Sequence, residues 1–359
     1  MSLRVGIVSA GWGAFAHLPA WRALDGVEVT TICTSRRETA EAVAKLHSIE
    51  NPCWNALEMC RDPDIDIVDL GTRPSIRLPM LIEALRHGKH IYISCPHAPD
   101  WAGAKAIDAA WDRSKSQTAV DAFSRYLPAH QKMKQMVDDG FLGEILGGTC
   151  HFNLSLFNRP NKKFPYNWFS DGTAGVSALR NNGGHLLYLL CEMLGPVKEL
   201  VADDSQLLKK WVFEDGDSLQ PETNDHADLI LRFVSGASIA LQASWSMTVQ
   251  EGWTIDLFGT KGRLQARSPT FPTVQECQLR AGRIGETLAP VAIAYPENPD
   301  IAMNWKSNPA PSYPMALTMY SLVEAIKGHG LAFPDFALAL EVERVLEAAR
   351  IASDERRWV

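Results

Sequence analysis

The chain has 359 residues, of which 46% are hydrophobic and 21% are charged, so it is long enough for two globular domains. Its net charge of −7 argues against sequence-independent binding to nucleic acid. No apolar run reaches the roughly 18 residues that a membrane helix needs. The first residues, Met1-Ser2-Leu3-Arg4, lack the basic region of a signal peptide. The seven cysteines are scattered and form no C-x-x-C pair, so we expect a cytoplasmic protein with no disulfide framework and no metal site.

Short β-rich runs alternate with helical stretches in the first third of the chain. The expected strands are 4–9, 27–33, 65–71, 90–94 and 118–123, and the expected helices are 14–24, 37–47, 76–87 and 102–114. Such alternation is typical of βαβ units. It predicts an N-terminal Rossmann domain with a doubly wound parallel sheet over residues 1–123.

After residue 123 long strands follow one another with little helix between them. We expect strands at 144–157, 197–205, 225–234, 237–248, 253–259 and 262–267, helices at 185–194, 315–327 and 336–353, and an irregular segment at 268–312. Residues 228–233 alternate apolar and polar side chains, which indicates a half-exposed antiparallel strand. Residues 124–359 are therefore predicted to form an α+β domain with a large, mostly antiparallel sheet flanked by helices.

The turn between the first strand and the first helix is rich in small residues. Dinucleotide sites need such residues for a tight turn, for close backbone approach to the pyrophosphate and for helix–strand packing. Against G-x-G-x-x-G the turn has Ser9, Gly11 and Ala14, so only the middle glycine remains. We expect Ser9, Gly11, Trp12, Gly13 and Ala14 to bind the cofactor, helped by amides at the helix N-terminus; an ordinary glycine-rich turn is the alternative.

The second expected strand ends in a segment with no acidic residue. An NAD site usually has Asp or Glu here, whereas small polar and basic residues receive the 2′-phosphate of NADP. Thr34, Ser35, Arg36 and Arg37 fit the second pattern and favour NADP over NAD. The alternative is a solvated helix start whose arginines bind nothing specific.

Several short motifs, in order along most of the chain, resemble one known family. They are Val5-Gly6-Ile7-Val8 with Gly11 and His17, Asp62–Val68, His87-Gly88-Lys89-His90-Ile91, Phe123–Pro128, Gly140–Ile145 and Phe258–Gly262. Together they resemble the glucose-fructose oxidoreductase / inositol dehydrogenase (Gfo/Idh/MocA) family. The resemblance implies a Rossmann domain, a second domain whose sheet often forms an oligomer interface, and hence a homo-oligomer, a dimer or a tetramer.

This chain departs from the family pattern at the residues that carry the family's chemistry. Family dehydrogenases carry Glu-Lys-Pro after the fourth strand, where the lysine contacts cofactor and substrate; this chain has Ser94-Cys95-Pro96. The family's second motif is an Asp followed four residues later by His and then by another Asp. Here Asn181, His185 and Tyr188 occupy those positions, and only the histidine is kept.

The altered centre retains one group suited to proton transfer. His185, with an ordinary pKa near about 6.5, can take and give the hydroxyl proton, or it can be a capping or core histidine. Cys95 carries no positive charge at neutral pH. His97 can fill part of the lysine's role or face solvent, Tyr188 can relay protons or pack in the core, and Asn181 can only hydrogen-bond.

The remaining expected contacts follow from the family resemblance. Cofactor contacts are Thr72 and Pro96; substrate contacts are His97, Arg125, Tyr166, Asn167, Trp168 and Arg180. The aromatic side chains suit a sugar or aryl face and Arg180 suits an anionic group. A loop that packs on its own domain is the alternative.

Three functions compete. The first is an NAD(P)-dependent oxidoreductase acting on a sugar, cyclitol, dihydrodiol or similar small hydroxy or keto compound. The second is a lyase or hydrolase that uses bound nicotinamide transiently. The third is a non-catalytic dinucleotide sensor, like a fungal repressor in the family that lacks the lysine. None requires nucleic acid or a membrane as a partner of this acidic chain.

Overall fold

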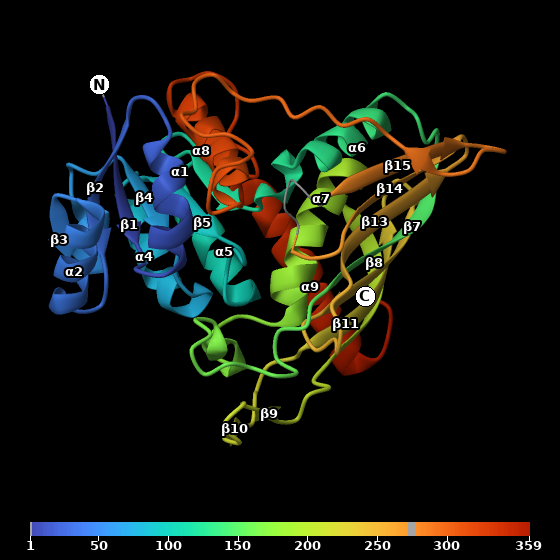
Figure 1. The fold of residues 1–359 in the computed structure, drawn as a ribbon, viewed down its shortest axis with the longest axis horizontal. Helices are drawn as coiled ribbons and strands as arrows, with labels where there is room; N and C mark the ends of the chain where they lie inside the picture. The colour runs from blue at the N-terminus through green and yellow to red at the C-terminus, as the bar shows by residue number, and fades with distance from the viewer. Residues whose placement is uncertain (1, 272–276) are drawn as a thin grey trace. The chain divides into compact units, whose positions relative to one another are not determined.

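The computed structural model describes residues 2–271 and 277–359, and it divides into two compact units. The first unit contains the described residues up to Phe123 together with Pro296–Leu340, and the second contains Ser124–Tyr295 and Glu341–Val359. Figure 1 shows the elements of both units. No helix among the described residues is both long enough and apolar enough to cross a membrane.

The first unit is built on a six-stranded parallel sheet in the order β3-β2-β1-β4-β5-β6. The strands are β1 (Leu3–Val8), β2 (Val27–Cys33), β3 (Asn51–Cys53), β4 (Ile67–Leu70), β5 (His90–Ser94) and β6 (Thr118–Asp121). The chain reverses its direction of winding between β1 and β4. Such a switch point opens a crevice at the carboxyl ends of the strands, where ligands of this fold class bind.

Helices connect these strands. The first connection is a π-helix, η1 (Gly13–His17), that runs directly into α1 (Leu18–Arg22). The other helices are α2 (Arg37–His47), α3 (Ala56–Arg61), α4 (Pro74–Arg86), α5 (Trp101–Ala110) and α8 (Ser312–Ile326). The side chains of the central strand β4 and of the edge strand β6 are buried on both faces, as expected for a parallel sheet covered by helices.

Residues 296–340 lie with the first unit, whereas the sequence analysis had assigned everything after residue 123 to the second domain. Their contacts explain the difference. The Ser312 hydroxyl donates to the Ala16 carbonyl at 3.0 Å, and the Val120 amide of β6 donates to the Pro334 carbonyl at 2.8 Å. The returning segment therefore completes the core of the first unit.

The second unit contains an eight-stranded sheet in the order β16-β15-β14-β13-β7-β12-β11-β8. Its strands are β7 (Ile145–Asn153), β8 (Val197–Ser205), β11 (His226–Phe233), β12 (Ser238–Ser244), β13 (Gly252–Gly259), β14 (Gly262–Ser268), β15 (Gln278–Arg283) and β16 (Ala289–Pro290). All neighbours pair antiparallel except β7 and β12. β11 alternates buried and exposed side chains along its length, which confirms the predicted half-exposed strand.

The remaining elements of the second unit are helices and one short hairpin. They are η2 (Phe123–Tyr126), α6 (Pro128–Asp138), η3 (Asn167–Ser170), η4 (Leu179–Gly183), α7 (Gly184–Leu194), the later part of α9 (Phe336–Glu355), and the pair β9 (Trp211–Val212) and β10 (Ser218–Leu219). Sequence patterns missed α6, whose apolar positions are sparse, and β3 with α3. The segment expected to be irregular, 268–312, contains β15 and β16, and part of it lies outside the described residues.

Candidate dinucleotide site and its buried charge network

The loop after β1 is organised around the side chain of Ser9. The Ser9 hydroxyl oxygen accepts hydrogen bonds from the amides of Gly11 at 3.1 Å and Gly13 at 3.3 Å. Trp12 already has helical backbone angles, and the helical run continues to Arg22. Serine thus closes the turn by its side chain where other dinucleotide sites have a first glycine. The amide-rich end of a ten-residue helical run then faces the carboxyl edge of the sheet.

Two glycines, Gly13 in this turn and Gly71 after β4, permit a close backbone approach. A Cβ on Gly13 would lie 2.8 Å from the Ser9 Cβ and 2.9 Å from a methyl of Ile7. A Cβ on Gly71, just after β4, would lie 3.0 Å from the Gly13 Cα. The helix therefore packs directly on the ends of β1 and β4, which is the close helix–strand packing that this site type requires. Gly11, in contrast, has room around its missing Cβ.

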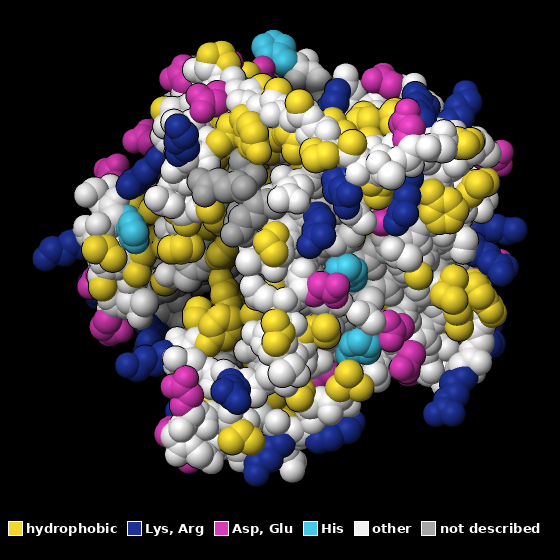
Figure 2. All heavy atoms as spheres, turned by 45° about the vertical axis from the view of Figure 1, so that its right-hand side comes forward, with side chains coloured by type: hydrophobic (Ala, Val, Ile, Leu, Met, Phe, Trp, Pro, Cys, Tyr) yellow, Lys and Arg dark blue, Asp and Glu magenta, His cyan; other side chains and the backbone are white. Residues whose placement is uncertain are grey.

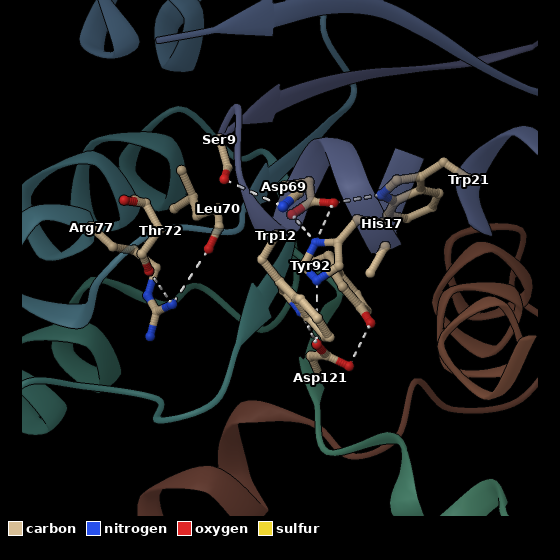
Figure 3. A network of polar contacts seen from close by, with 12 residues as sticks. Ser9, Trp12, His17, Trp21, Asp69, Leu70, Thr72, Arg77, Tyr92 and Asp121 are labelled. Carbon is tan, nitrogen blue, oxygen red and sulfur yellow. Dashed lines mark hydrogen bonds and ion pairs between the residues drawn. The ribbon is translucent and has the colours of Figure 1, made fainter. Parts of the chain in front are cut away.

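A network of buried polar side chains lies beneath the turn, and His17 is at its centre (Figure 3). One ring nitrogen of His17, Nδ1, lies 2.9 and 3.0 Å from the two carboxylate oxygens of Asp69 on β4. The other, Nε2, lies 3.2 Å from Asp121 at the end of β6. His17 and Asp69 have no exposed surface, and Asp121 is 3% exposed. Both ring nitrogens thus face carboxylates, the arrangement that suits a protonated imidazolium.

The charge of this histidine is set by its neighbours. Burial by itself lowers the pKa of His17, but the charge of Asp69 and the hydrogen bonds to Asp121 and Asp69 outweigh it and raise the pKa to about 10. His17 is therefore a cation at neutral pH. Since two carboxylates surround one cation, the cluster needs further donors, because a buried charge without partners is costly.

Three aromatic side chains supply those donors. The Trp21 indole donates to Asp69 at 2.7 Å, and the Tyr92 hydroxyl on β5 donates to Asp121 at 3.2 Å. The Trp12 indole also donates to Asp121, at 3.2 Å. Trp12 belongs to the phosphate-binding turn itself. The network therefore connects the conformation of that turn to β4, β5 and β6.

A second buried cation, Arg77 of α4, fixes the ends of β4 and β5. Its guanidinium donates to the carbonyls of Leu70 at 3.4 Å and Thr72 at 2.9 Å, and to those of Pro96 and His97. Arg77 is 1% exposed. The segments that carry the expected residues Thr72, Cys95, Pro96 and His97 are thus held by one side chain. Cys95 is half-buried, and the Cys95–Pro96 peptide bond is cis.

His97 lies in the interior rather than facing solvent. It is 2% exposed, and its ring packs edge-on against Phe336 with centroids 4.6 Å apart. This favours a packing role for His97 over the substitute for the family lysine that the sequence also allowed.

The residues after β2 form an exposed turn, as a ribose-phosphate site requires. The Thr34 hydroxyl donates to the Arg36 carbonyl at 2.9 Å. The Arg37 guanidinium lies over the Trp54 ring, 5.1 Å from its centroid, and pairs with Glu41 at 2.7 Å. Ser35, Arg36 and Arg37 are exposed. Arg37 is thus partly engaged already, whereas the Arg36 side chain makes no hydrogen bond or ion pair with the residues that the structure describes.

The second unit brings three expected residues onto one continuous helical stretch. Asn181 lies in η4 and His185 and Tyr188 lie in α7. His185 is half-buried and packs edge-on with Phe152 and Phe271, at centroid distances of 6.5 Å each. Tyr188 is 3% exposed, which fits a core position better than a proton relay. Asn182, which the sequence analysis overlooked, anchors the stretch by donating to the carbonyls of Phe152 and Ser244, both at 3.1 Å.

The expected substrate contacts of the second unit are largely engaged within it. Arg125 pairs with Glu192 at 2.6 Å, and Arg180 pairs with the buried Glu343 at 2.7 Å. The positive charge of Arg180, which the sequence predicted to bind an anionic substrate group, is thus already balanced by Glu343.

The polar-aromatic loop packs on its own unit. Asn167 donates to the Asn161 carbonyl at 2.7 Å. The rings of Tyr166 and Trp168 contact Phe169, with centroids 5.6 and 4.6 Å away. Phe169 in turn packs on a core cluster that contains Phe157, Trp211 and Trp245. These contacts favour the alternative given in the sequence analysis, a loop that packs on its own domain, over a loop of substrate contacts.

Sequence reasoning missed the acidic members of the His17 network. The signal was present, because Asp69 interrupts the apolar strand Ile67–Leu70 and Asp121 ends the strand Thr118–Asp121. A carboxylate within a fully buried parallel strand needs a partner. His17, which follows the phosphate turn, is the cation that partners them.

The strand order, the small-residue turn and the helix that starts from it define the first unit as a dinucleotide-binding Rossmann domain. Joined to a unit built on a large sheet, it places the chain in the class of two-domain dinucleotide-dependent oxidoreductases. Residues 3–122 match the oxidoreductase family with an NAD-binding Rossmann fold, and residues 130–265 match the GFO/IDH/MocA C-terminal domain. The chain therefore belongs to the Gfo/Idh/MocA family, as the sequence motifs predicted.

Individual relatives agree with this assignment. The chain is 28% identical over 255 residues to the dehydrogenase aclE of Aspergillus oryzae, an alignment that covers 68% of this chain and 69% of the relative. It is 25% identical over 292 residues to levoglucosan dehydrogenase of Pseudarthrobacter phenanthrenivorans, covering 73% of each.

Solved structures share the whole fold. An NAD-binding oxidoreductase from Klebsiella pneumoniae is 23% identical, with a TM-score of 0.87 and coverage of 100% of this chain and 99% of that one. A levoglucosan dehydrogenase in complex with NADH and L-sorbose is 21% identical, with the same TM-score and coverage.

Proposed function

We propose that this protein is an NAD(P)-dependent oxidoreductase that acts on a sugar, cyclitol, dihydrodiol or similar small hydroxy or keto compound without the family's lysine. The observation that carries the proposal is the turn after β1, where Ser9, Gly11 and Gly13 shape a helix start at the carboxyl edge of the sheet. The sugar substrates named for relatives, levoglucosan and D-apiose, support the substrate class.

The residues of the turn fit a dinucleotide. Amides at the start of the helical run would bind the pyrophosphate, and the space at Gly11 leaves the backbone open to approach. Thr72 and Pro96, on the segments held by Arg77, would contact the nicotinamide half. When bound, the nicotinamide ring supplies or accepts the hydride. Trp12, anchored to Asp121, would keep the turn in the binding conformation.

We further propose NADP as the preferred cofactor, although relatives are crystallised with NADH. Thr34 and Ser35 offer hydroxyls and Arg36 offers an exposed cation where an acidic residue would repel a phosphate. Titration of cofactor fluorescence tests this. Arg36→Ala should weaken NADPH binding by about tenfold to a hundredfold, since a hydrogen-bonded charge contributes about 1.5–3 kcal/mol, and leave NADH binding unchanged. The exposed Arg61→Ala is the matched control; equal losses for both cofactors would contradict NADP preference.

His185 is proposed to take the substrate's hydroxyl proton during oxidation and to return it during reduction. A general base of this kind contributes about 10²–10⁴-fold to the rate. Asn181, one helical turn earlier, would hydrogen-bond a substrate hydroxyl but not accept its proton. Cys95 cannot provide the positive charge of the absent lysine, so substrate orientation must come from hydrogen bonds alone.

Turnover followed by reduced-nicotinamide absorbance, with a panel of sugars, polyols and their ketones, tests the assignment. His185→Gln should lower kcat by about 10²-fold or more, whereas Cys60→Ala, a buried thiol elsewhere in the first unit, should not change it. Loss of turnover in Cys95→Ala alone, with His185→Gln active, would contradict the assigned roles.

One observation favours a second function, a non-catalytic dinucleotide sensor. The triplet Ser94-Cys95-Pro96 has lost the group that usually contacts both cofactor and substrate. A sensor would bind NADPH tightly, turn over none of the panel, and gain activity only as Cys95→Lys. Tight cofactor retention with product formed but no net redox change would instead indicate a lyase or hydrolase that uses nicotinamide transiently.

We also propose that the protein is a cytoplasmic homo-oligomer, a dimer or a tetramer, that uses the outer face of the large sheet. A groove of about 530 Å³ crosses β7, β8, β11 and β12, with Thr149, His151, Asp228 and Ile230 in its lining. Figure 2 shows apolar side chains next to histidine and acidic ones on the side turned forward. Light scattering of Ile230→Lys should give a smaller assembly than the wild type, and Lys198→Glu should not. Seven free thiols suit a reducing compartment.

A further inference from the structure

Two cysteines occupy paired positions at the ends of neighbouring strands. Cys33 is the last residue of β2 and Cys53 is the last residue of β3, and the two are register partners in a parallel pairing. Register partners in adjacent parallel strands point to the same side of a sheet and lie about 4.8 Å apart. This separation is within the Cα range of about 4.4–6.8 Å that a disulfide spans.

The two thiols already interact and differ in access. Their side chains are neighbours in the sheet register, and each sulfur lies near a carbonyl, Cys53 at 3.3 Å from Asn55 and Cys33 at 3.7 Å from Thr34. Cys53 is half-buried on the edge strand, whereas Cys33 is 1% exposed. A solvent-borne reagent can therefore reach Cys53, whereas Cys33 is shielded from solvent and lies beside Cys53 in the register.

We propose that Cys33 and Cys53 form a peroxide-reactive dithiol, in which Cys53 is the attacking thiol and Cys33 the resolving thiol. The Cys53 sulfur attacks one oxygen of a hydroperoxide, the O–O bond breaks, and an alcohol or water leaves. The Cys53 sulfenic acid that forms is then attacked by the Cys33 sulfur. An S–S bond forms, the S–O bond breaks, and the hydroxide leaves as water with the Cys33 proton. The hydroperoxide is reduced as the two thiols are oxidised.

Acid–base properties of the pair agree with this division. The hydrogen bond from Cys33 outweighs burial and lowers the pKa of Cys53 to about 6, although the charges of Glu58 and Asp62 oppose the shift. The hydrogen bond to Cys53, together with burial, raises the pKa of Cys33. Cys60, a third thiol nearby, has its pKa raised to about 12 by burial and is fully buried. It provides an inert control.

The consequence for the cofactor rests on the proposed function. Thr34 follows Cys33, and its amide donates to the Cys53 carbonyl at 3.0 Å. Trp54 follows Cys53 and carries the Arg37 guanidinium over its ring. A disulfide would remove the thiol hydrogens that face the carbonyls of Thr34 and Asn55 and would hold both sulfurs in one covalent geometry, and so would change the turn proposed to hold the 2′-phosphate. Oxidation is therefore expected to weaken NADPH binding reversibly.

The experiment treats the full-length protein with one equivalent of hydrogen peroxide and follows intact mass and peptide maps. We expect the loss of two hydrogen atoms and a Cys33–Cys53 linked peptide in the wild type and in Cys60→Ala. Cys33→Ser should stop at a sulfenic acid on Cys53 that dimedone traps, and Cys53→Ser should not react. The rate of Cys53 alkylation in native protein should be half-maximal near pH 6 rather than near the ordinary thiol pKa of about 8.5. Oxidation confined to Cys95, or no linked peptide in the folded wild type, would overturn the proposal.

A cofactor titration separates this inference from the proposed function. NADPH should bind the reduced wild type, bind the oxidised form more weakly, and regain its affinity after dithiothreitol. Equal affinity of both forms would overturn the link to the cofactor. No binding even to the reduced protein would refute the proposed function and leave the dithiol chemistry standing.

Discussion

Two buried histidines, His17 in the first unit and His130 in the second, are in opposite states of charge. In the first unit His17 lies between Asp69 and Asp121, and its pKa is raised to about 10. In the second unit His130 of α6 lies against the Trp253 ring at 4.3 Å, with Nδ1 2.6 Å from the Ser124 carbonyl. Burial there outweighs that hydrogen bond and lowers the pKa to about 4.

The contrast teaches that burial alone does not decide the charge of a histidine. Both side chains leave water, which penalises the charged form in each. Two carboxylates reverse that penalty for His17, while an aromatic ring, a carbonyl and the Cys277 thiol at 3.6 Å cannot do so for His130. The charged cluster belongs to the cofactor-binding unit, where it holds Trp12 of the phosphate turn. The neutral histidine only fills a core.

The same substitution at both sites should produce the largest difference. His17→Phe leaves two buried carboxylates without their cation and should lower the free energy of unfolding by about 3–5 kcal/mol. His130→Phe leaves one buried carbonyl without its donor and should cost about 1–3 kcal/mol. The added ring volume is the same in both variants, so urea unfolding compares the electrostatic losses directly. Equal costs would mean that the carboxylates do not hold a cation.

The pH dependence of stability should have opposite signs at the two sites. An unfolded histidine titrates near about 6.5. The raised pKa of His17 means that its contribution is complete below that value and is lost as pH rises through about 10. The lowered pKa of His130 means that its contribution is complete above that value and is lost as pH falls through about 4. Imidazole nitrogen NMR should find His17 protonated at pH 8 and His130 neutral at pH 5.5. A neutral His17 at pH 8 or a protonated His130 at pH 5.5 would contradict the opposite charge states.

A smaller effect should follow from Trp12→Phe, which removes one donor to Asp121 and keeps an aromatic ring. Hydrogen bonds to charged groups contribute about 1.5–3 kcal/mol, and His17 and Tyr92 remain as partners of Asp121. We expect weaker dinucleotide binding in a fluorescence titration with a modest loss of stability. Phe15→Leu, at a neighbouring side chain that is 60% exposed, serves as control. Unchanged dinucleotide binding in Trp12→Phe would show that the network does not act through the turn.

The smallest effect is expected for an exposed ion pair of the same unit. Glu41→Gln breaks the contact with Arg37 on the surface of α2 and should change stability by only about 0.3–0.5 kcal/mol. The midpoint of urea unfolding measures this. A loss as large as that of His17→Phe would indicate that unfolding reports overall charge rather than the buried cluster.

Much of this architecture could be predicted from the sequence. Strong periodicity located β2, β5, β8 and α2 at their observed bounds, since long patterned runs depend little on context. The short strand β3, with one proline in three residues, gives no such pattern, because pairing with β2 and not propensity makes it a strand.

The candidate site was less accessible to sequence reasoning. The turn residues could be named because their spacing is local. The sequence marks Asp69 and Asp121 as carboxylates in buried strands that need partners, but it does not pair them with His17, which lies 52 and 104 residues away along the chain. Likewise, the pairing of Arg180 with Glu343 across 163 residues depends on tertiary structure, so its charge looked available for a ligand.

The contacts of Arg77 show how the residue at position 95 could change during evolution while the fold around it stays the same. Arg77 holds the segments after β4 and β5 through main-chain carbonyls at Leu70, Thr72, Pro96 and His97. A carbonyl is present whatever side chain a residue carries, so this support does not depend on the side chain at position 95. The chemistry at that position is therefore uncoupled from the scaffold that displays it. Evolution could exchange a lysine for a cysteine there without rebuilding the fold, and protein engineering can use the same position in the opposite direction.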